Sequence, residues 1–188
     1  MLVLKEKGVV YIAISTASLL CTGFADSEWY NHEENLSVWK IPNEDDIVVG
    51  MGGCGFVRDL FAYDEDFIRG ELTLDKMILE VIPKIQKRLR RYDNLNKKDN
   101  EMRAAFVFAQ KDRAFSILSN FVCAEIEEIA VCGADFDIAL PALRIAKELP
   151  PEQRLLLVND IVNQAIDHPS SPLCVINTKT CKPYLLRK

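Results

Sequence analysis

Apolar residues follow two different spacings along the chain, and each spacing recurs in neighbouring pairs of segments. Short runs rich in β-branched and aromatic residues, separated by turn residues, predict pairs of antiparallel strands. Lys7-Gly8 is the expected tight turn of the first pair, and we expect the polar, aromatic-rich segment Asp26–Asn35 to be a loop. The expected strands are Leu2–Lys5, Val9–Ser15, Leu36–Ile41, Asp46–Met51, Arg103–Ala109, Ala114–Ser119, Ile126–Cys132, Leu173–Asn177 and Tyr184–Leu186.

Apolar residues at three- and four-residue spacing predict four helices. The first should open at Gly52–Gly55 and run to about Arg69. Thr73 is the expected N-cap of the second helix, and Pro83 should kink or split it. The third and fourth helices adjoin at Pro151, which suits the first position of a helix.

The order of the elements indicates the class of fold. Strands that come as hairpins and helices that come as pairs favour α+β layers over a doubly wound parallel sheet. Two sheets covered by two helix pairs would bury every apolar face. A chain of 188 residues can bury a substantial core, so we expect one domain over residues 1–188.

Composition narrows the function classes without naming one. With 49% hydrophobic and 27% charged residues, the chain is neither disordered nor fibrous. A formal charge of −5 disfavours a general role in nucleic-acid binding. Only two histidines, His32 and His168, and six cysteines without C-x-x-C spacing give no metal site. We therefore expect no metal and no cofactor, with the cysteines as free thiols in a reducing cytoplasm.

Four segments, in the right order over nearly the whole chain, resemble the proteasome-type N-terminal-nucleophile (Ntn) hydrolases. Gly8–Ala13 is similar to the second strand of proteasome subunits. Lys40–Ile41, followed by Gly50–Gly53, resembles the family's Lys-Ile/Val … Gly-x-Ala-Gly segment. Val131–Ala134 resembles the Gly-Ser-Gly segment before the third helix, and Ala165–Ser170 resembles the Ala-x-x-Asp-x-x-Ser segment. The resemblance implies a four-layer αββα sandwich.

The same resemblance implies positions for the catalytic residues. Active members use a terminal threonine whose hydroxyl is the nucleophile and whose own amine is the base. Lys40 falls on the position of the lysine that lowers the pKa of the nucleophile. Asp167 and Ser170 fall on the second aspartate and the serine beside it. Ile14 or Ser15 falls where the first aspartate should be, and neither carries a charge.

The nucleophile itself has no counterpart at the start of the sequence. No Thr, Ser or Cys lies between Met1 and Gly8. We therefore expect a non-catalytic, proteasome-like protein that acts through self-association or partner binding. The resemblance implies a homo-oligomer or an assembly with related subunits, because the family's helices pack into rings. We expect no nucleic-acid or membrane partner.

Two other functions remain open. An active hydrolase would need cleavage before a later hydroxyl or thiol, or a different use of Cys54 or Ser170. Cys54 follows two glycines at an expected helix start, where the backbone amides would lower the pKa of a thiol, although a buried structural cysteine is the alternative. A secreted binding domain would use Val9–Leu20 as a signal segment, but the strand-forming residues of this run and Glu6 before it favour the cytoplasmic alternative.

A basic stretch follows Pro83 and has two interpretations. It is the solvated face of an amphipathic helix, or it meets an acidic surface on a neighbouring subunit. Its members are Lys84, Lys87, Arg88, Arg90, Arg91, Lys97 and Lys98.

Overall fold

The computed structural model gives the arrangement of most of the chain. The residues that it describes are 1–15, 17–20, 28–31, 37–53, 55–93, 95–96, 98–132, 136–166 and 171–187.

The first sheet has five antiparallel strands in the order β10-β1-β2-β11-β12. Its central pairing sets Leu173 of β11 opposite Ser15 of β2 and Asn177 opposite Tyr11. The strands are β1 Leu2–Glu6, β2 Val9–Ser15, β10 Ile129–Val131, β11 Leu173–Asn177 and β12 Tyr184–Leu186.

The second sheet also has five antiparallel strands, in the order β5-β6-β7-β8-β9. Gly50 of β6 lies opposite Val38 on one side and Val107 on the other. The strands are β5 Val38–Lys40, β6 Ile47–Gly53, β7 Ala104–Gln110, β8 Arg113–Ile117 and β9 Cys123–Glu125.

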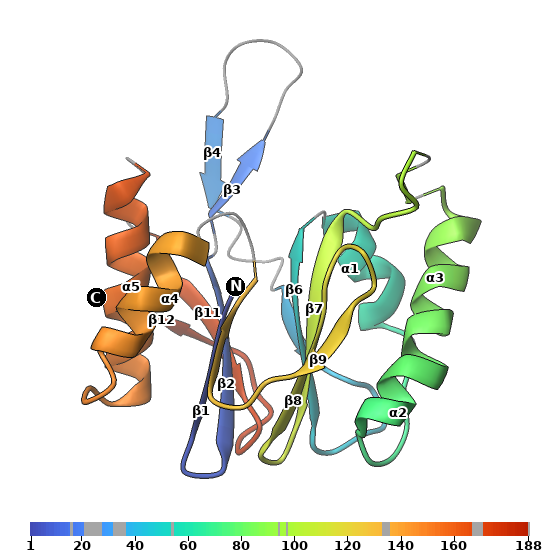
Figure 1. Cartoon of the computed structure of the whole chain (residues 1–188), viewed down its shortest axis with the longest axis horizontal. Coiled ribbons are helices and arrows are strands. Elements are labelled where there is room, and N and C mark those ends of the chain that lie inside the picture. Colours follow the sequence, from blue (N-terminus) through green and yellow to red (C-terminus); the bar gives the residue numbers. More distant parts are fainter. Residues whose placement is uncertain are drawn as a thin grey trace.

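Helices cover the outer face of each sheet, so the molecule has four layers (Figure 1). Helices α4 (Phe136–Ile145) and α5 (Pro151–Ala165) pack on the first sheet. The second sheet carries the other helices, which are α1 Gly55–Ala62, α2 Leu74–Lys76, the π-helical turn η1 Met77–Val81 and α3 Ile82–Arg91. The expected four-layer αββα sandwich is confirmed.

Three apolar clusters fill the three spaces between the layers. The cluster between the second sheet and its helices contains the large aromatic side chains Phe61, Phe106 and Phe108. The cluster between the sheets consists mainly of small and β-branched residues. The third cluster joins the first sheet to α4 and α5. The central strands, such as β6 and β7, are thus buried on both faces.

Several local predictions are confirmed. Lys7 and Gly8 both have positive φ angles, 51° and 78°, as a tight hairpin turn requires. The hydroxyl of Thr73 accepts a hydrogen bond from the backbone N–H of Lys76 at 3.1 Å, which caps α2. Pro151 begins α5. Regular α-helix is interrupted before Pro83, because the π-helical turn η1 ends at Val81 and α3 begins at Ile82 with the proline in its first turn.

The expected loop at Asp26–Asn35 is wrong in its described part. Residues Glu28–Asn31 form β4, which pairs with β3 (Ala17–Leu20) as a separate two-stranded ribbon. In Figure 1 this ribbon extends beyond one end of the sandwich. The aromatic residues Trp29 and Tyr30 favour a strand, and this preference outweighs the polarity of the neighbouring residues.

Two element boundaries also differ from the prediction. Helix α1 ends at Ala62 and not near Arg69, because Asp64 accepts a hydrogen bond from the N–H of Asp66 and turns the chain. The strand expected at Ile126–Cys132 is confirmed only over Ile129–Val131, which is β10, and the short strand β9 before it was not predicted. There the chain leaves β9 of the second sheet and enters β10 of the first.

The two sheets are in close contact at Gly50, which leaves no space for a side chain there. A methyl group added there would overlap Cγ2 of Ile12 and lie 3.0 Å from Sδ of Met1. We predict that Gly50→Ala lowers the free energy of unfolding by about 1–3 kcal/mol in urea denaturation. Gly52→Ala is the matched control, because its added methyl group would lie 4.0 Å from Met1. Equal stability of the two variants would contradict this packing.

Candidate functional site

The candidate site lies where β2 ends and Met1 enters the space between the sheets. The Met1 ammonium donates a hydrogen bond to the carbonyl of Cys132 at 3.0 Å, and the N–H of Cys132 donates to the carbonyl of Met1 at 3.0 Å. The Met1 side chain approaches Gly50 of the facing sheet. Met1 is thus held by the first sheet and packs towards the second.

Two serines meet at the same end of β2. The hydroxyls of Ser15 and Ser171 are 2.6 Å apart and form a hydrogen bond. The carbonyl of Ser171 accepts a second hydrogen bond, at 2.9 Å, from the buried side chain of Asn159. At this end of β2, the side chains of Ser15 and Ser171 thus form an uncharged pair of hydroxyls. Sequence analysis identified Ser15 but missed Ser171, since only the pairing of β2 with β11 brings it there.

Lys40 is the last residue of β5 on the facing sheet. It is opposite Val48 on β6, whereas Met1 approaches Gly50 of that strand. Its ammonium is 3.4 Å from the carboxylate of Asp45 in the turn after β5. Among the described residues, the ion pair of Lys40 is with Asp45.

The other expected site residues, Asp167 and Ser170, lie outside the described residues, as does Cys54. Their roles stay predictions. The chain around the first two is described on either side, since α5 ends at Ala165 and Ser171 bonds to Ser15.

Two thiols lie in the apolar cluster between the sheets. Burial raises the pKa of Cys174 to about 11. Burial also raises the pKa of Cys132, although the nearby ammonium of Met1 opposes this effect. A thiol needs a lowered pKa to be an effective nucleophile at neutral pH. Neither residue is such an activated nucleophile.

A small pocket of about 190 Å³ adjoins Ser171, between α5 and β12. Pockets that bind drug-sized ligands usually have at least about 300 Å³. Within the described ranges, no group of three or more His, Cys, Asp or Glu side chains has the geometry to hold a metal ion. None of the described helices is long and apolar enough to span a membrane.

The comparisons with known proteins concern the fold. No protein-family model matches the chain, and no curated protein matches it. Among solved structures, BPH from Thiobacillus denitrificans, in complex with epoxomicin, superposes with a TM-score of 0.72 at 16% identity, over 94% of this chain and 96% of that one. The fold is that of the proteasome-type Ntn hydrolases.

Two further structures support this fold. The Anbu complex from Pseudomonas aeruginosa, a helical assembly, gives a TM-score of 0.65 at 14% identity, over 100% of this chain and 85% of that one. HslV from Trypanosoma brucei gives 0.56 at 13% identity, over 94% and 97% of the two chains. The proteasome-type resemblance is thus confirmed for the fold of this chain.

The raised thiol pKa can be tested by alkylation. We predict that Cys174 of the folded protein reacts with iodoacetamide about a hundredfold more slowly at neutral pH than in guanidinium, because its pKa is about 11 instead of 9.0. Below that pKa, the rate should rise about tenfold per pH unit. Peptide mapping by mass spectrometry gives the rate for this cysteine. Equal rates in the folded and unfolded protein would contradict a buried, protonated thiol.

Proposed function

We propose that the chain acts as one proteasome-like domain that associates with copies of itself or with related subunits and does not hydrolyse peptides by the Ntn mechanism. The observation that carries this proposal is the exposure of apolar side chains on both outer helix layers. Exposed apolar residues gathered on one surface are typical of protein interfaces.

The layer formed by α4 and α5 exposes the first set. Leu157 and Ile161 are exposed and four residues apart, so they share one face of α5. Ile145, at the end of α4, is 83% exposed. These three side chains are exposed to water, and a partner surface that covered them would bury their apolar area.

The opposite layer exposes a second set. Leu74 and Ile78 are exposed one helical turn apart, and Leu79 beside them is 73% exposed. The two helix layers lie on opposite sides of the molecule (Figure 1). Two different surfaces on opposite sides suit head-to-tail contacts, which produce a ring or a filament. The similarly folded Anbu complex forms a helical assembly.

The geometry of the β2 end supports the absence of Ntn chemistry. Ser15 bonds to the neutral hydroxyl of Ser171, and Lys40 is directed towards Asp45. The buried thiol of Cys174 has a raised pKa. We propose that Lys40, Asp167 and Ser170 are positions retained from a catalytic fold without a catalytic role. The free state of the four described cysteines also supports a cytoplasmic location.

Catalysis can be tested with epoxomicin, which is bound by the similarly folded BPH. We predict no covalent adduct in the intact mass after incubation and no cleavage of fluorogenic peptides above a buffer blank, because the described site offers no activated nucleophile. An active proteasome preparation, treated in parallel, is the positive control. A mass increase equal to epoxomicin would overturn the non-catalytic proposal.

Self-association can be tested by light scattering after gel filtration. We predict that the wild-type chain is oligomeric and that the double variant Leu157→Glu and Ile161→Glu has a lower mass, because two carboxylates would lose water in the interface. The double variant Asn100→Asp and Asn120→Asp adds the same charge outside the helix layers and should keep the wild-type mass. A monomeric wild-type chain would refute the proposal, and unchanged mass in the α5 variant would exclude this face.

A further inference from the structure

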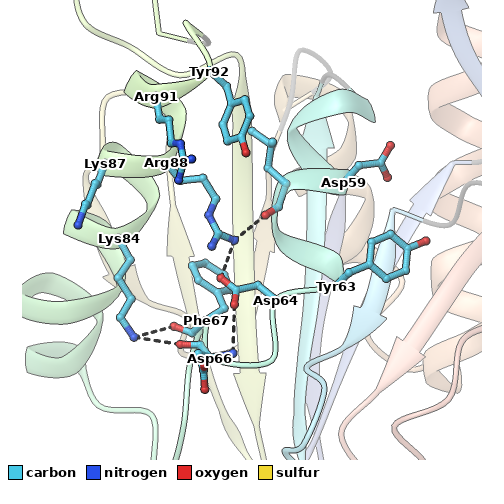
Figure 2. Close-up of a pocket in the computed structure, with 11 residues that line it drawn as sticks. Asp59, Tyr63, Asp64, Asp66, Phe67, Lys84, Lys87, Arg88, Arg91 and Tyr92 are labelled. Atoms are coloured by element: carbon cyan, nitrogen blue, oxygen red, sulfur yellow. Dashed lines mark hydrogen bonds and ion pairs between the residues drawn. The ribbon is translucent and has the colours of Figure 1, made fainter.

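A groove of about 750 Å³ runs between α1 and α3 on the outer side of the second sheet (Figure 2). It combines four basic side chains from one face of α3 with acidic and aromatic side chains of α1 and the segment after it. The lining residues are Asp59, Leu60, Tyr63, Asp64, Asp66, Phe67, Lys84, Lys87, Arg88, Arg91 and Tyr92.

Two of the basic residues hold the groove together. Arg88 donates to the carbonyl of Leu60 at 2.6 Å and pairs with the carboxylate of Asp64 at 2.5 Å. Lys84 donates to the carbonyls of Asp66 and Phe67 at 3.2 and 3.1 Å. These contacts tie α3 to α1 and to the turn that follows it. They are therefore structural: the charge of Arg88 is paired with a carboxylate, and Lys84 keeps its charge but is held against backbone carbonyls.

The other two basic residues of the groove, Lys87 and Arg91, do not join α3 to α1. Lys87 and Arg91 are both exposed and lie one helical turn apart. Among the described residues, Lys87 forms no hydrogen bond or ion pair, and Arg91 contacts only the ring of Tyr92, 5.8 Å from its centroid. Since Asp59 is paired with Arg58, Lys87 and Arg91 are exposed cations of the groove that no described carboxylate pairs with.

Exposed aromatic side chains accompany these charges. Tyr63 is 74% exposed on α1 and Tyr92 is 48% exposed at the end of α3. Tyrosine combines a large apolar ring with a hydroxyl group and is enriched in the energetically important parts of protein interfaces. An occupant of this groove would thus meet both cations and apolar surface.

We propose that this groove binds an acidic peptide segment of a partner protein. Carboxylates of the segment pair with Lys87 and Arg91, and its apolar side chains lie against Tyr63 and Tyr92. The inference deepens the proposed function, on which it rests, because it gives the chemistry of a partner and the surface that receives it.

The alternation of charges in the groove favours a peptide over a nucleic acid. The carboxylates of Asp59, Asp64 and Asp66 also line the groove, and they would repel a continuous row of phosphates. The net charge of −5 adds to this repulsion. A peptide with separated carboxylates can place each one at a cation and avoid the aspartates.

The test measures fluorescence polarisation of a labelled peptide with both ends blocked, composed of glutamate, phenylalanine and serine. The same peptide with glutamine at every glutamate should bind more weakly. We expect the double variant Lys87→Gln and Arg91→Gln to weaken binding of the glutamate peptide about tenfold, the size expected for two exposed ion pairs. The double variant Arg90→Gln and Lys98→Gln removes the same charge outside the groove and should change binding less than about twofold.

Four results would overturn the inference. The first is equal binding of the two peptides, and the second is equal weakening of binding by the two double variants. The third is a labelled oligonucleotide that binds more tightly than the peptide through Lys87 and Arg91. The fourth is a lower oligomeric mass of the groove variant, which would assign the groove to a second copy. Light scattering of the wild-type chain separates the two proposals. An oligomer that does not bind the peptide refutes only the groove, and a monomer that binds it refutes only self-association.

Discussion

The close contact between the two sheets is the constraint on which the rest of the structure depends. The facing strands contribute small or β-branched side chains there, such as Val3, Val10, Val107 and Ala109. Gly50 leaves room for Ile12 and Met1. Because this contact buries one face of each sheet, the other face of each sheet must be covered by helices, and the four-layer order follows.

Because the two sheets pack closely, the side chains on the two faces of a strand differ in size. On β7, Phe106 and Phe108 point towards the helices, whereas Val107 and Ala109 between them point towards the other sheet. On β8, Phe115 faces the helices and Ala114 faces the sheet. Large aromatic side chains fill the wide, irregular space under helices, and small ones allow two sheets to pack about 10 Å apart.

Sequence reasoning predicted the layers because burial on both faces leaves continuous apolar runs, and turns such as Lys7-Gly8 separate them clearly. It failed where the outcome depends on distant parts of the chain. The end of β9 and the start of β10 are decided by pairing with β8 of one sheet and with β1 of the other. The surroundings of Lys40 likewise depend on the turn that brings Asp45 beside it, and no motif spacing contains that information.

The sheet contact also determines where charge can be used. Between the sheets, water is excluded, and burial keeps thiols such as Cys174 protonated. At the end of β2, the hydroxyls of Ser15 and Ser171 bond to each other. On the outer helix layer, by contrast, Lys87 and Arg91 remain solvated and uncompensated by acidic neighbours. The apolar interior of this chain therefore stabilises the fold, and the unpaired charges of Lys87 and Arg91 lie on a helix surface.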